Sequence, residues 1–146
     1  MLIAYENERL PHETINFIEK KLYKYPVFKK AVQACEEQIV DIRTGTKQWS
    51  EEPPPTTFQQ DSNVENKAIK ILVLERKMKK YAYWVDGIDD VMSTLNETEK
   101  ELIRLKYFEN NLNHTEVAGE LNVGRTTYYE IRNSIMERFA LYFNVE

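Results

Sequence analysis

The sequence predicts an all-α protein, in which an N-terminal helical hairpin and a long heptad-patterned helix precede a C-terminal three-helix helix-turn-helix module. The first reason is composition, since only 5 Pro and 4 Gly occur among 146 residues while Glu, Lys, Leu, Ile and Ala fill long runs. The second is the recurrence of apolar residues three and four positions apart. The third is the stretch 114–133, HTEVAGELNVGRTTYYEIRN, which meets the packing demands of two short helices joined by a tight turn.

Two helices are expected in the first 42 residues. Pro11 suits the first position of a helix, and the apolar positions that follow at helical spacing are Ile15, Ile18, Leu22 and Tyr25. This helix should end at Tyr25, because the residue before a proline avoids helical angles. A second helix should then carry an apolar face made of Phe28, Val32, Cys35, Ile39 and Ile42. Neither arm of this hairpin can bury its stripe alone.

A polar linker is expected at about residues 43–61. Its sequence, RTGTKQWSEEPPPTTFQQD, has no apolar period, and three consecutive prolines cannot continue a helix. Ser62 or Asn63 is then expected to cap a helix that runs to about Ser93. Gly87 lies inside this helix, and its low helix propensity allows a bend or a frayed turn there.

The long helix carries apolar residues that alternate three and four apart, the pattern of a coiled-coil seam. They are Ile71, Leu74, Met78, Tyr81, Val85, Ile88, Met92 and Leu95. Two interpretations of the seam remain open. The N-terminal hairpin packs on it within one chain, or residues 64–95 pair with a second copy and form a homodimer.

Residues 95–146 are expected to form a second domain after the packing or oligomerisation domain 1–94. Its helices should span roughly 97–109, 113–121 and 125–141, and Asn96 or Thr98 should cap the first. That helix should bury Leu102, Ile103, Leu105 and Phe108. In the helix-turn-helix, the positions expected to point inward are Val117, Leu121, Val123, Tyr128 and Ile131. Ala118 should lie where the two backbones approach closest, and Asn122 should take the left-handed corner.

The start of the last helix should then point outward, towards a major groove if DNA is present. Arg125 can bind guanine O6 and N7 in a bidentate manner, and a threonine methyl group can meet a thymine methyl group. Phosphate oxygens suit other side chains near the helix start. The candidate DNA-binding residues are therefore Arg125, Thr126, Thr127, Tyr129, Arg132 and Asn133.

The charge balance weakens the case for a nucleic-acid partner. The net charge is −4, and residues 95–146 contain nine acids against six Lys and Arg. A binder of polyanions is expected to be basic. This balance supports an alternative, a protein-binding adaptor that docks on RNA polymerase and never touches DNA.

Enzymatic chemistry, metal binding and cofactors are not expected. Cys35 is the only cysteine, which rules out an internal disulfide and favours a reducing cytoplasm. His12 and His114 are far apart in the sequence, and no phosphate-binding glycine loop occurs. We expect no signal peptide, because MLIAYENERLP has no basic segment followed by a long apolar run. We expect no membrane span, because no apolar stretch reaches about eighteen residues.

The segment ETEKELIRLKYFENNLNHTEVAGELNVGRTTYYEIRNSIMERF resembles the DNA-binding module of region four of bacterial sigma factors. Together with the preceding KYP-containing segment, polar spacer and AYWVDGID helix, the chain is similar to small phage late-gene transcriptional regulators of the ArpU and RinA type. The resemblance implies a sequence-specific regulator that acts on double-stranded DNA with the host RNA polymerase, in the cytoplasm of a bacterial host cell. A small terminase subunit in viral DNA packaging is an alternative, since it also joins such a motif to helical assembly segments.

Overall fold

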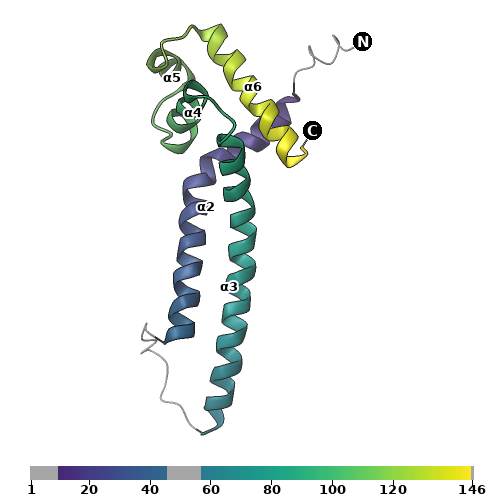
Figure 1. Ribbon diagram of the computed structural model, residues 1–146, viewed down its shortest axis with the longest axis vertical. Helices are drawn as coiled ribbons and strands as arrows, with labels where there is room; N and C mark the ends of the chain where they lie inside the picture. Colours follow the sequence, from purple (N-terminus) through teal and green to yellow (C-terminus); the bar gives the residue numbers. More distant parts are fainter. Residues whose placement is uncertain (1–9, 46–56, 146) are drawn as a thin grey trace. The chain divides into compact units, whose positions relative to one another are not determined.

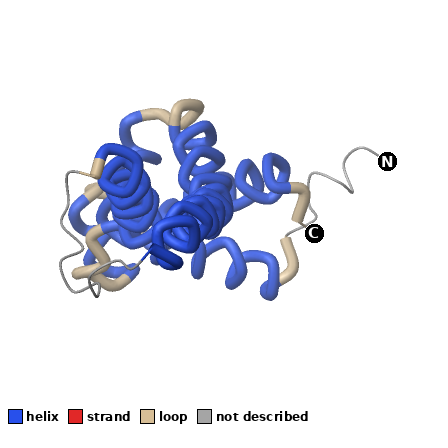
Figure 2. The backbone as a smooth tube through the Cα atoms, turned by 90° about the horizontal axis from the view of Figure 1, so that it is seen from below, coloured by secondary structure: helices blue, strands red, loops and turns tan. Residues whose placement is uncertain are grey.

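A computed structural model describes the backbone of residues 10–45 and 57–145, and the side chains of the second segment from residue 64 onward. All regular elements of these residues are helical, as Figures 1 and 2 show, so the all-α prediction is confirmed. The elements are α2 (His12–Thr44), α3 (Thr57–Met92), α4 (Glu97–Ile103), the π-helical turn η1 (Arg104–Phe108), α5 (His114–Glu120) and α6 (Arg125–Phe143). None of these helices is long and apolar enough to cross a bilayer.

The chain divides into two compact units. The first unit comprises Met1–Pro26 and Trp84–Glu146, and the second unit comprises Val27–Tyr83. These bounds differ from the division expected between residues 94 and 95. The first turns of α2 belong with the C-terminal helices, so this segment contributes to the same core as α6.

The predicted break at Tyr25 is wrong. α2 is one helix of 33 residues with Pro26 inside it, so no N-terminal hairpin forms. A proline inside a helix removes one hydrogen bond and costs about 3 kcal/mol. Tertiary contacts of Tyr25 oppose this cost. Its buried ring stacks on Phe108 at a centroid distance of 4.4 Å, and its hydroxyl donates to Asp89.

α3 begins earlier than expected. It starts at Thr57, so Ser62 and Asn63 lie inside the helix and do not cap it. Residues 57–61 contain neither Gly nor Pro, and their polarity, which suggested a linker, does not prevent a helix. α2 ends at Thr44 and is followed by Gly45 with φ of +67°. The rest of the expected linker, residues 46–56, lies outside the described residues. The predicted end of α3 near Ser93 is confirmed, since α3 ends at Met92.

In the second unit, α2 and α3 lie side by side (Figure 1). The Phe28 ring stacks on Tyr81 at 5.2 Å, and Arg43 pairs with Glu75 at 3.3 Å. The seam residues of α3 in this unit are half-buried, namely Ile71, Leu74, Met78 and Tyr81. The seam therefore packs on α2 of the same chain, the first of the two interpretations.

The core of the first unit is larger. Its fully buried side chains include Leu22, Ile88, Leu102, Ile103, Tyr107, Val117, Tyr128, Ile135, Met136 and Phe139. Asn96 caps α4 in a reciprocal capping box with Glu99, as one of the two expected caps. The burial of η1 differs from the prediction. Lys106 and Tyr107 are buried, while Leu105 and Phe108, which were expected to be buried, are only half-buried.

The π-helical turn explains this exchange. The amide of Glu109 donates to the carbonyl of Arg104 at 2.8 Å, a bond that spans five residues. One extra residue in the turn rotates the positions after Arg104 relative to an α-helix. Tyr107 therefore enters the core where α-helical spacing had placed its neighbours.

Gly87 is a point of close approach and not of fraying, because α3 continues through it. A Cβ atom at Gly87 would lie 2.5 Å from the Phe143 ring. The Phe143 ring packs in turn on Trp84 at 4.9 Å. Gly87 therefore lets the last turn of α6 lie directly on α3.

Replacing Gly87 with alanine should weaken the fold. Overpacking costs about 1–3 kcal/mol, and the better helix propensity of alanine returns roughly 1 kcal/mol. We expect Gly87→Ala to lower the free energy of unfolding by about 1 kcal/mol in urea denaturation. Gly119→Ala in α5 is the matched control, because a Cβ there meets nothing within 4 Å. Equal stability of the two variants would contradict the close approach.

Candidate nucleic-acid interface

α5 and α6 are joined by a short turn with specific backbone demands. Asn113 caps α5 in a second reciprocal capping box, with Glu116. Ala118 is buried, and its carbonyl accepts a hydrogen bond from the amide of Val123 at 3.0 Å. Asn122 has φ of +61°, as the sequence predicted for the corner. Gly124 has extended angles at the N-cap of α6. A glycine at this position costs only about a few tenths of a kcal/mol of helix stability relative to serine.

The first turn of α6 lies at the surface of the first unit. Arg125, Thr126 and Thr127 are all exposed, while Tyr128 is completely buried. The rest of the inner face of α6 consists of Ile135, Met136, Phe139 and Ala140, all buried. Ile131, which was expected to be buried, is half-buried, as are Leu121 and Val123. α6 is therefore packed against the core along its inner face, while the side chains of its first three residues are exposed.

Two guanidinium groups lie near the ring of Tyr129. The Arg125 and Arg132 groups stand 5.9 Å and 5.1 Å from the centre of its half-exposed ring. A cleft of about 210 Å³ lies beside this group, between α5 and α6. Its lining consists of His114, Thr115, Ala118, Gly119, Val123, Arg125, Tyr128 and Tyr129. This concave, mixed polar and aromatic surface adjoins the exposed start of α6.

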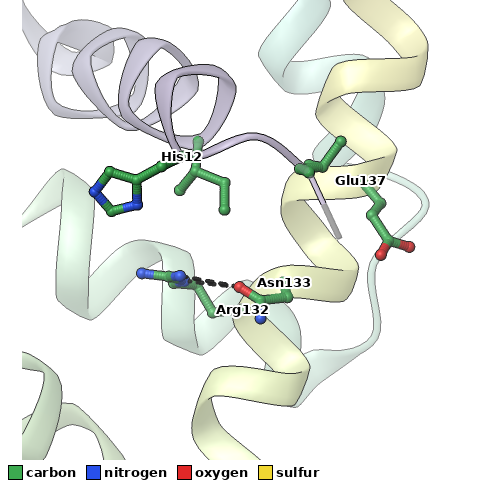
Figure 3. Close-up of a pocket in the computed structure, with 6 residues that line it drawn as sticks. His12, Arg132, Asn133 and Glu137 are labelled. Carbon is green, nitrogen blue, oxygen red and sulfur yellow. Dashed lines mark hydrogen bonds between the residues drawn. The ribbon is translucent and has the colours of Figure 1, made fainter. Parts of the chain in front are cut away.

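Arg132 is not free at the surface. Its side chain is only 15% exposed and lies 3.7 Å from the carboxylate of Glu19. It also donates to Oδ1 of Asn133 at 2.9 Å, the bond drawn in Figure 3. Both residues line a cavity of about 210 Å³ together with Leu10, His12, Ile15 and Glu137. Arg132 therefore joins α6 to the start of α2.

The same carboxylate holds a third element. The Tyr107 hydroxyl donates to Glu19 at 2.6 Å, and burial raises the pKa of this phenol far above its ordinary value. Nearby, Lys106 donates to the hydroxyl of Tyr23 and lies 4.8 Å from the centre of its ring. A network of polar side chains thus runs under α6.

The structure divides the six predicted site residues into two sets. Arg125, Thr126, Thr127 and the edge of Tyr129 form one exposed group at the start of α6. Arg132 and Asn133 point into the contact with α2. Sequence reasoning did not find Glu19 and His114 as neighbours of this site. Glu19 carries no local signal, because its role depends on a contact across more than one hundred residues.

No group of three or more His, Cys, Asp or Glu side chains suited to a metal ion occurs in the part of the chain that the structure describes. Comparison with known proteins gives no match, whether to a protein-family model, a curated protein or a solved structure.

His114 gives the site a predicted pH response. Its Nδ1 shares a hydrogen bond of 2.5 Å with the Tyr128 hydroxyl. Burial lowers the pKa of His114 below its ordinary value of 6.5, and the nearby Lys106 and Arg132 lower it further against the opposing effect of Glu19. The folded state therefore binds fewer protons than the unfolded state as the pH falls through this range, so acid destabilises the fold.

We expect the free energy of unfolding to fall as the pH is lowered through the ordinary histidine pKa of 6.5, and His114→Gln to make this fall smaller. Urea denaturation at a series of pH values measures both slopes. His12→Gln, at the exposed start of α2, is the matched control for loss of a histidine. A slope that is unchanged in His114→Gln would show that this imidazole does not contribute.

Proposed function

We propose that α5, the turn 121–124 and α6 form a helix-turn-helix that binds duplex DNA in a sequence-specific manner, and that the protein regulates transcription. The observation that carries the proposal is the first turn of α6, where three residues able to contact DNA are exposed while the remaining inner face of the helix is buried. A recognition helix needs this combination, since its N-terminal residues contact base edges. The resemblance to sigma region four and to phage late-gene regulators supports the host RNA polymerase as a further partner.

Arg125 supplies the base contact in this proposal. Its guanidinium can reach guanine O6 and N7 together, which is worth about 1–3 kcal/mol of discrimination. The hydroxyls of Thr126 and Thr127, with the free amides at the start of a helix of 19 residues, suit phosphate oxygens. Tyr129 holds the Arg125 side chain by its ring and borders the cleft.

Arg132 has a different role from the one expected from the sequence. Moving its guanidinium to a phosphate would break the pair with Glu19 and leave a mostly buried carboxylate with less compensation. Breaking a buried pair costs about 3–5 kcal/mol, more than one phosphate contact returns. We therefore assign Arg132 and Asn133 to positioning α6, and the contacts with DNA to the residues before them.

Selection of bound fragments from random duplexes should yield a preferred sequence, and Arg125→Ala should weaken binding to it by about 1–3 kcal/mol and relax the preference at one base. Fluorescence anisotropy with the selected duplex and its single-base variants measures both effects. Arg104→Ala is the matched control, because Arg104 is an exposed arginine of the same unit engaged with Glu101 and Glu109. Equal losses in the two variants would mean that the loss reflects net charge and not a base contact.

A polymerase-binding adaptor is the second candidate, and the acidic balance of residues 95–146 favours it. The two functions differ in their response to salt. A DNA reader should lose affinity as salt rises, with log K falling by about 0.9 per phosphate contact for each unit of log salt concentration. Titration of a random-sequence duplex pool and of the selected duplex at two salt concentrations measures this slope. Absence of binding to every duplex at low salt would leave the adaptor as the remaining candidate.

A further inference from the structure

The second unit buries little apolar surface for its length. Among its described side chains, the buried apolar residues are Cys35, Ile39 and Ile42. The large apolar side chains that are more than half exposed are more numerous, namely Val27, Val40, Val64, Ile69, Leu72, Val73 and Tyr83. More large apolar side chains of this unit are therefore exposed than buried. Exposed apolar side chains mark an interaction surface where they gather on one face of an element.

The exposed residues on α3 follow a second heptad pattern. Glu65, Ile69, Leu72, Arg76, Lys79 and Tyr83 are spaced alternately four and three apart, and all are exposed. Leu72 and Arg76 each lie two positions from the seam residue Leu74. Two positions correspond to a rotation of about 200° around an α-helix. α3 therefore has the seam on one side, against α2, and this second stripe on the opposite side. Ala68 and Val73 widen the apolar centre of the second stripe.

We propose that the second stripe binds the same stripe of a second copy, with the two α3 helices antiparallel around a two-fold axis. In the register centred between Lys70 and Ile71, Ile69 faces the partner subunit's Leu72, and by symmetry Leu72 faces the partner subunit's Ile69. The same register sets Glu65 opposite the partner subunit's Arg76 at each end of this apolar centre. The two apolar layers are thus flanked, one at each end, by two ion pairs between a glutamate and an arginine.

The charges select this arrangement over a parallel one. In a parallel pair, equivalent positions meet, so Glu65 would face its own copy and Arg76 would do the same. Such like-charge pairs destabilise a coiled coil and the antiparallel pairs stabilise it. A symmetric self-complementary surface is also the commonest way in which soluble chains associate. The seam remains packed on α2 of each chain, so the dimer uses a surface other than the seam.

The mass of the full chain in solution tests the proposal, by light scattering after size exclusion over a range of concentrations. We expect twice the chain mass of 17.4 kDa for the wild type, and the monomer mass for Leu72→Glu at the same concentration. Gln33→Glu is the matched control, because it adds the same charge at an exposed site of α2 and should remain dimeric. Circular dichroism confirms that each variant is folded. A monomeric wild type, or a Leu72→Glu variant that remains dimeric, would overturn the proposal.

Charge exchange tests the register. Glu65→Arg and Arg76→Glu should each raise the dimer dissociation constant by about tenfold, because each creates two like-charge pairs. The double variant should return the constant to near the wild-type value, since it restores opposite charges with exchanged sides. Additive losses in the double variant would overturn the antiparallel register. None of these measurements includes DNA, so their outcome is independent of the proposed DNA binding.

Discussion

The position of α6 depends on the carboxylate of Glu19. A mostly buried carboxylate costs several kcal/mol unless its partners compensate it. Here the hydroxyl of Tyr107 donates a hydrogen bond to it, and the guanidinium of Arg132 forms an ion pair with it at 3.7 Å. These three side chains come from α2, η1 and α6, so one buried charge requires three distant segments to meet. Because α6 is held at the buried Tyr128 and again at Arg132, the exposed side chains of its first turn start from a backbone of fixed orientation.

Local rules predicted much of the C-terminal half. Asn122 is left-handed because the turn between two close helices needs such a residue, and Asn ranks next to Gly there. Asn96 was one of two expected caps, and the exposed first turn of α6 followed from the burial expected for Tyr128. Each of these features depends on residues within about one helical turn. The sequence itself contains that information.

The predictions that were wrong concern positions whose contacts join residues far apart in the sequence. The proline rule predicted a break at Tyr25, but Phe108 and Asp89, more than sixty residues away, hold Tyr25 inside a continuous helix. The π-helical turn that buries Tyr107 has no local signal, and Arg132 was assigned to phosphate because its partner Glu19 is equally remote. Tertiary contacts outweighed local preference at each of these positions, which is why helical spacing predicted the site only in part.

The structure also changes the meaning of the charge balance in residues 95–146. Four of the acids pair with basic side chains of the same unit, in the pairs Glu97–Lys100, Glu99–Arg138, Glu101–Arg104 and Glu109–Arg104. Lys106 and Arg132 are directed into the polar network under α6, which leaves Arg125 as the cation at the exposed tip. Few phosphate contacts are then available to residues 95–146, so this segment alone would bind arbitrary DNA weakly. Discrimination between sites would depend on base contacts at the tip, and pairing of two copies would supply affinity that charge does not.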